Sequence, residues 1–97
     1  MASGTIKVQQ QFLFEEVEIA DTTIAANTGS DFTLNVSKNG YMPVGIVQIR
    51  KVGANYANVP ISRFYIDSSN IAHIAAYNTG SSSRSIEIHA TIMYQKV

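Results

Sequence analysis

The fold is decided by residues 39–50, NGYMPVGIVQIR. Asn39 and Gly40 predict a hairpin turn, because both residues readily adopt left-handed backbone conformations. Pro43 cannot donate to a strand ladder, so we expect a strand to begin there. Residues 44–52 alternate two largely apolar sets, which predicts a strand in the middle of a sheet. Gly45 inside it predicts a β-bulge or a close backbone approach, so a larger residue there should damage folding or assembly.

Alternating segments continue on both sides of this stretch. Residues 32–36 and 85–94 alternate apolar and polar side chains, and residues 71–77 set Ala72, Ile74 and Ala76 against a second set that contains His73 and Tyr77. Polar turn clusters lie at 67–70 and 78–83. Connections this short exclude parallel crossovers. We therefore expect one all-β domain over residues 1–97, with residues 1–4 as a flexible lead-in. The predicted architecture is an antiparallel β-sandwich, jelly-roll-like, with about seven or eight short strands.

The first third of the chain contains two conflicting alternations. Ile6 and Val8 predict a strand, and a second one follows from Phe12 to Ile19, where the parity of the apolar residues switches. A bulge at residues 15–16 would bring both apolar sets to one face. A helix is the competing interpretation, since Glu and Leu favour helices, but the aromatic and β-branched residues favour a strand.

Composition excludes several classes of protein. The 97-residue chain has zero net charge, which argues against nucleic-acid binding. It lacks cysteine, so neither a disulfide nor a cysteine zinc site can form. We find no signal peptide, and no apolar run approaches the ~20 residues needed for membrane insertion. Charged residues make up only 14% of the chain, against roughly 25% in typical soluble domains. The surface is therefore expected either to be covered by Ser, Thr, Asn and Gln or to be partly hidden by partner chains.

Acidic residues are concentrated near the start of the chain. Five of the seven lie within residues 1–31: Glu15, Glu16, Glu18, Asp21 and Asp31. One interpretation is a solvated acidic edge strand, which guards against edge-to-edge pairing. The other is an acidic edge that meets a basic surface of a neighbouring subunit.

No catalytic motif is present. The sequence has neither a Gly-x-Ser-x-Gly elbow nor a phosphate-binding glycine loop, and Glu15 and Glu16 point to opposite faces of a regular strand. We therefore expect no enzymatic activity and no cofactor.

Two groups of residues are candidates for binding. Tyr56 stands in a predicted loop beside Asn55 and Asn58, and an aromatic face beside amides suits either a sugar ring or a protein contact. His73 and His89 would face each other if residues 71–77 and 85–94 formed a hairpin. Two imidazoles are too few for a closed metal site, although three copies of the chain would supply six. We therefore expect an exposed or interfacial polar pair and no metal site, with a metal ion held by His73 and His89 of several copies as the alternative.

Three motifs carry a resemblance to a known family. They are GYMPVGIV at residues 40–47, FYI at 64–66 before a Ser/Asn turn, and the alternating strand at 86–96 that ends in MYQK. Together they resemble the small β-sandwich domains of tailed-bacteriophage tail fibres and receptor-binding proteins. The opening MASGTIK is similar to the openings of short phage structural proteins.

The resemblance implies a non-enzymatic virion protein, made in the host bacterial cytoplasm, that forms a homotrimer and contacts other virion proteins. It also implies attachment to a saccharide of the host cell surface. The family's domains usually sit on a longer chain with a shaft or anchor, which this sequence does not show. Two alternatives therefore remain open: a capsid decoration or head-fibre protein, and a stand-alone carbohydrate-binding module.

Overall fold

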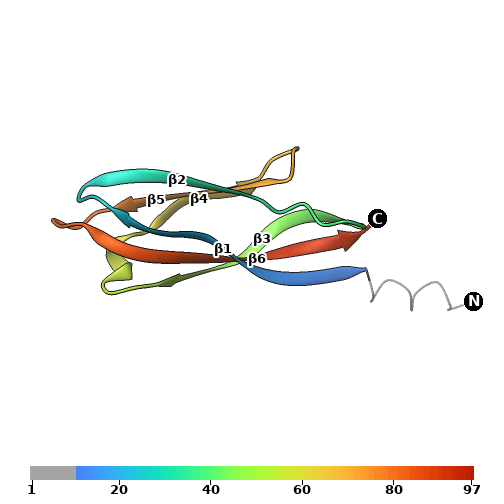
Figure 1. Ribbon diagram of the computed structural model, residues 1–97, viewed down its shortest axis with the longest axis horizontal. Coiled ribbons are helices and arrows are strands. Elements are labelled where there is room, and N and C mark those ends of the chain that lie inside the picture. The colour runs from blue at the N-terminus through green and yellow to red at the C-terminus, as the bar shows by residue number, and fades with distance from the viewer. Residues whose placement is uncertain (1–10) are drawn as a thin grey trace, which may run out of the picture.

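The computed structural model describes residues 11–97, which form an all-β domain (Figure 1). These residues contain six strands and one short 3-10 helix, η2. Their bounds are β1 Phe12–Ile24, β2 Thr28–Asn35, β3 Tyr41–Val52, η2 Tyr56–Asn58, β4 Ile61–Ile66, β5 Ile71–Asn78 and β6 Arg84–Lys96. The predicted lead-in at residues 1–4 and the predicted strand at Ile6 and Val8 lie outside the described residues.

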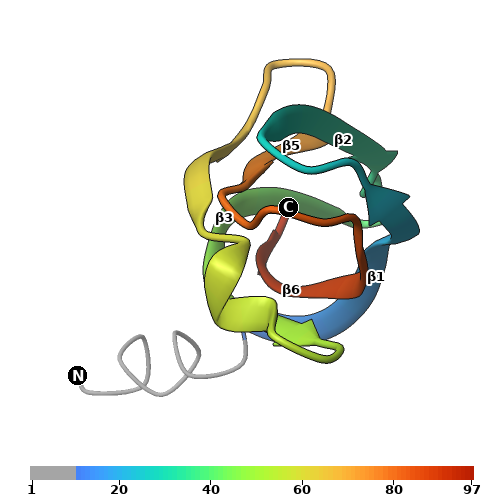
Figure 2. The same cartoon turned by 90° about the vertical axis from the view of Figure 1, so that its left-hand side faces the viewer.

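The strands form two three-stranded antiparallel sheets, ordered β1-β6-β3 and β2-β5-β4. Figure 2, which looks along the strands, shows the two sheets curving around a common interior in a sandwich-like arrangement. The expectation of seven or eight strands is wrong for the described residues, which form six. A jelly roll has eight strands, so this more specific description is not confirmed. The difference arises because β1, β3 and β6 are each 12 or 13 residues long rather than short.

The core lies between the central strands of the two sheets. Alternate residues of β6 point inward, as the sequence predicts, and are almost fully buried: Ile86, Ile88, Ala90, Ile92 and Tyr94. Ala72, Ile74 and Ala76 of β5 face them from the other sheet. The period of two is strict because a central strand has one face on the core and one on solvent.

The stretch at residues 39–50 supplies β3 and the turn before it. Gly40 has a φ of 83°, and the Tyr41 N–H donates to the Lys38 carbonyl at 3.0 Å, which confirms the predicted turn. The prediction of a central strand is wrong, since β3 lies at the edge of its sheet and β6 lies in the middle. The strand begins before Pro43, and the edge position explains how it accommodates a proline.

A bulge between Pro43 and Gly45 confirms the prediction for Gly45. No close backbone approach accompanies it, because a Cβ placed on Gly45 would meet no atom of the described chain within 4 Å.

Strand β1 also contains a bulge, but not at the predicted position. The register shift falls between Glu18 and Ala20 rather than at residues 15–16. Ile19 and Ala20 are therefore both buried, while Phe12 and Phe14 point to solvent. The helical alternative for this segment is wrong, since the whole of Phe12–Ile24 is a strand.

Candidate functional site

The candidate site is the outer face of the β1-β6-β3 sheet, the face turned away from the core. Its central row is made of the outward residues of β6: Glu87, His89, Thr91, Met93 and Gln95. The register places Phe14, Glu16 and Glu18 of β1 opposite Met93, Thr91 and His89. From the other side, Gly45, Gln48 and Arg50 of β3 lie opposite the same three residues of β6. The face therefore has an apolar half around Met93 and a polar half around His89.

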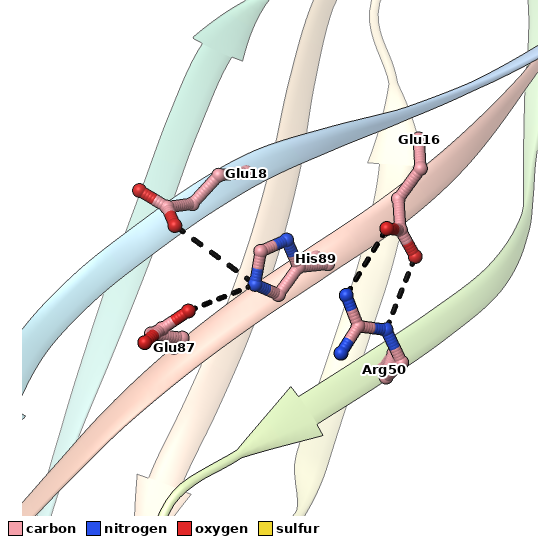
Figure 3. Close-up of polar contacts among 5 residues, drawn as sticks. All are labelled: Glu16, Glu18, Arg50, Glu87 and His89. Carbon is pink, nitrogen blue, oxygen red and sulfur yellow. Dashed lines mark hydrogen bonds and ion pairs between the residues drawn. The ribbon is translucent and has the colours of Figure 1, made fainter.

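The polar half contains a forked ion pair between the two edge strands (Figure 3). Arg50 donates from Nε to Glu16 Oε2 at 3.2 Å and from Nη2 to Glu16 Oε1 at 3.1 Å. This bond lowers the pKa of Glu16 and raises the pKa of Arg50. It links β1 to β3 across β6, so two strands that share no backbone hydrogen bonds are held by side chains.

Beside this pair, His89 lies between two carboxylates (Figure 3). His89 Nε2 is 3.1 Å from Glu87 Oε1 and 3.9 Å from Glu18 Oε1. One ligating atom from each of the three residues lies within 4.8 Å of the other two. The His89 side chain is 15% exposed, and those of Glu87 and Glu18 are 42% and 49% exposed. Such a set of nitrogen and oxygen donors can hold a proton or a metal cation.

The apolar half of the outer face lies toward the start of β1. It consists of the side chains of Phe12, Phe14, Met42, Val44 and Met93. All but the partly buried Met93 are exposed, and Phe14 is 56% exposed. Exposed apolar residues that gather on one face of a sheet are a common feature of surfaces that contact other molecules.

Three of the five acidic residues near the start of the chain have a lysine or arginine partner within the same chain, and one of the three, Asp31, pairs with Arg63 in the other sheet. Glu16 binds Arg50, and Glu15 lies 2.7 Å from Lys38 Nζ, a contact that raises the lysine pKa. Strand β1 is an edge strand, as one interpretation of the acidic residues expected. The other interpretation, contact with a neighbouring subunit, stays a prediction.

The residues predicted to bind a ligand lie in and next to η2, at the opposite end of β3 from Tyr41. The ring of Tyr56 is exposed, and Lys51 Nζ lies 5.6 Å from its centre. Asn55 adopts a left-handed conformation with a φ of 60°, and the Asn58 carbonyl accepts two hydrogen bonds from Thr79. The backbones of both asparagines thus shape the turn, and ligand binding by this group stays a prediction.

His73 and His89 do not form the predicted pair. Strand β5 pairs with β2 and β4, whereas β6 pairs with β1 and β3, so the proposed hairpin is wrong and the histidines lie in different sheets. His73 stacks on Tyr65 with ring centres 4.5 Å apart, and its Nε2 lies 2.8 Å from Asp67 Oδ2. His89 instead has the two glutamates, which sequence reasoning missed. Part of this cluster could have been predicted from the sequence, since Glu87 and His89 are two residues apart in one strand and therefore point to the same face.

A second feature missed by sequence reasoning is a depression on the outer face of the β2-β5-β4 sheet. It has a volume of about 510 Å³, and its lining includes Asp31, Arg63, Ala75 and Tyr77. Asp31 and Arg63 approach each other to 3.7 Å across β5. An aromatic wall, a small-residue floor and a carboxylate–guanidinium pair could bind a polar ligand.

Within residues 11–97, no helix has the length and apolar character needed to cross a membrane.

Comparisons with known proteins add no further information on function. No protein-family model, no curated protein and no solved structure matches the chain.

Proposed function

We propose that this chain is a non-enzymatic structural or adhesion protein that assembles into homo-oligomers through the outer face of its β1-β6-β3 sheet. The resemblance to phage tail-fibre and receptor-binding domains supports a virion as the place of assembly. The observation that carries the proposal is the apolar half of this face, where Phe12, Phe14, Met42 and Val44 are exposed.

The energetic argument concerns apolar surface left in water. Removing such surface from water is favourable by roughly 25 cal/mol per Å², so covering several exposed large side chains supplies part of an interface's binding free energy. Phe and Met are also enriched at the centres of interfaces. The chain is only 14% charged, which leaves few groups whose desolvation would oppose association.

A second copy of the chain is the partner favoured by charge. The chain has zero net charge, so its copies lack the long-range repulsion that keeps strongly charged monomers apart. Next to the apolar half, the outer face carries the charges of Glu16 and Arg50, which form an ion pair with each other. Two copies can therefore approach through the apolar half of this face without bringing unpaired like charges together, with the carboxylates around His89 left outside the contact.

The test is the oligomeric state of Phe14→Asp, measured by light scattering coupled to size exclusion. The wild-type chain should be an oligomer and the variant a monomer with unchanged far-UV circular dichroism. Tyr65→Asp is the matched control, since Tyr65 is 43% exposed and lies opposite His73 on the outer face of the other sheet. A monomeric wild type, or an oligomer that survives Phe14→Asp, would refute the proposal.

A second candidate function, binding of a cell-surface saccharide, is favoured by the depression on the β2-β5-β4 sheet. Tyr77 offers an aromatic ring there, while Asp31 and Arg63 offer an acceptor and a donor for hydroxyl groups. A glycan array probed with the wild type, Arg63→Ala and Tyr56→Ala tells whether a saccharide binds in this depression or at the η2 turn. Loss of binding only with Arg63→Ala assigns this depression, and loss only with Tyr56→Ala assigns the η2 turn. No glycan binding by the wild type would reject this function.

A further inference from the structure

We propose that Glu18, Glu87 and His89 form a binding site for a divalent transition-metal cation, with Zn²⁺ as the representative ion. The site lies in the polar half of the outer face shown in Figure 3. It does not depend on the proposed assembly, because all three ligands come from one chain.

The first argument is the local balance of charge. Within residues 11–97, four other carboxylates each have a partner of their own: Glu15 with Lys38, Glu16 with Arg50, Asp31 with Arg63, and Asp67 with His73. Glu18 and Glu87 instead share the single imidazole of His89.

The strands that flank this cluster do not remove the imbalance. Asp21 of β1 lies opposite Glu87 in the register and adds a further negative charge to the same face. From β3, Arg50 lies opposite His89, but its guanidinium is bonded to Glu16. One imidazole cannot balance two carboxylates, so the site is net negative, which favours a bound cation.

The second argument is geometric. A tetrahedral Zn²⁺ with bonds of about 2.0–2.2 Å holds its ligand atoms roughly 3.3 Å apart. His89 Nε2 and Glu87 Oε1 are already 3.1 Å apart, and Glu18 Oε1 is 3.9 Å from the same nitrogen. The two glutamates are about half exposed, so small rotations of their side chains can complete the arrangement.

The third argument is that the ligands stand on paired strands rather than on a loop. Glu18 and His89 are direct cross-strand partners, and Glu87 is two residues from His89 on the same face of β6. Ile19 and Ala20 are buried directly after Glu18, which fixes the direction of β1 at the site. Sites built on strands hold their ligands more precisely than sites built on loops.

The donor set selects the class of metal. One imidazole and two carboxylates suit Zn²⁺ and related transition metals, whereas Ca²⁺ and Mg²⁺ prefer sites made of oxygen atoms alone. Three protein ligands leave a fourth position, which the exposure of Glu18 and Glu87 opens to water. A bound ion would link β1 to β6 through side chains.

The experiment is calorimetric titration of tag-free, chelator-treated protein with ZnCl₂ near neutral pH. We expect one Zn²⁺ per chain, and His89→Ala and Glu87→Gln should each weaken binding at least about tenfold. His73→Ala is the matched control, because His73 is also a partly exposed strand histidine but contacts one carboxylate, and it should bind as wild type does. Affinity should also fall as the pH is lowered, since protons compete for the same ligands.

Three outcomes would overturn the proposal: no binding by the wild type at millimolar Zn²⁺, undiminished binding by both site variants, or equal weakening in the His73→Ala control. Circular dichroism checks that each variant is folded. If His89→Ala does not fold, the result rests on Glu87→Gln, which keeps the size of the side chain and removes its charge.

Discussion

Asn78 should be the polar side chain whose loss costs the fold most. It is fully buried, and its Nδ2 donates to the carbonyls of Ile24 at 2.9 Å and Ser82 at 3.0 Å. Its Oδ1 accepts from the Gly80 N–H at 2.9 Å. One amide therefore ties the end of β1 to the loop that carries the chain from β5 to β6.

The cost of Asn78→Ala follows from which groups lose their partners. The Ile24 carbonyl bond is buried, and leaving a buried group unsatisfied costs about 1–3 kcal/mol, so we assign it about 2 kcal/mol. Ser82 and Gly80 lie in the loop, where water can replace the amide, so their two bonds together contribute about 1 kcal/mol. The free energy of unfolding should fall by about 3 kcal/mol, which lowers Tm by roughly 12–24 °C in a domain of this size.

Urea unfolding followed by far-UV circular dichroism measures this change. The control is Asn35→Ala, which removes one exposed hydrogen bond, from the Ser37 N–H to Asn35 Oδ1, and should cost less than about 1 kcal/mol. If the free energy of unfolding of Asn78→Ala lies within about 0.5 kcal/mol of the wild-type value, the hydrogen bonds of Asn78 do not hold the loop in place.

Three further predictions concern single side chains. The sequence suggested that a larger residue at Gly45 would damage folding, but a Cβ there meets no atom within 4 Å, so Gly45→Val should leave the free energy of unfolding within about 0.5 kcal/mol of wild type; a clear drop in urea midpoint would contradict this. The pKa of Asp67 is lowered below its ordinary 3.8, chiefly by His73. Its contribution to stability is present above 3.8 and lost as pH falls through the lower folded pKa, so Asp67→Asn should flatten acid unfolding curves over that range. Burial raises the pKa of Tyr94 above 10.0, so stability should fall as pH rises beyond 10.0. Tyr94→Phe should lose that alkaline dependence, and also the bond of the hydroxyl to the Val36 carbonyl; an unchanged dependence would contradict the assignment.

The alternation of apolar and polar residues predicted best those strands that have one face in the core and the other in solvent. The inward set of β6 follows from Ile86 and every second residue after it, because a strand between core and solvent must keep a period of two. The turn at residues 67–70 was equally local: Asp67 Oδ1 accepts from Ser69 and Ile71, and Asn70 has a φ of 63°. Both features depend on neighbours in the sequence, so the sequence alone was enough.

Strand partners depend on the whole chain and could not be predicted in the same way. The loop between β5 and β6 has a length that suits a hairpin, which suggested that His73 faces His89. In the structure this loop passes from one sheet to the other and is held by Asn78. His73 contacts Asp67 of the preceding turn, whereas His89 contacts Glu18 of β1 and Glu87 of its own strand. The position of β3 was missed for the same reason, since its apolar sequence suits a central strand but the longer alternation of β6 takes that place.

The position of the bulge in β1 connects the two surface features that carry the proposals. The predicted bulge at residues 15–16 was meant to place Phe12 and Phe14 on the same face as Val17 and Ile19. The bulge lies later in the strand, because Ile19 and Ile24 would face opposite sides of a regular strand and both are buried. Because the bulge follows Glu18, the strand before it places both phenylalanines and Glu18 on the same outer face. The apolar half and the metal-ligand cluster therefore both depend on the unbroken strand before this bulge. A change that moved the bulge to just after Phe14 would turn Glu18 toward the core and remove the metal-ligand cluster, while Phe12 and Phe14 would stay on the outer face.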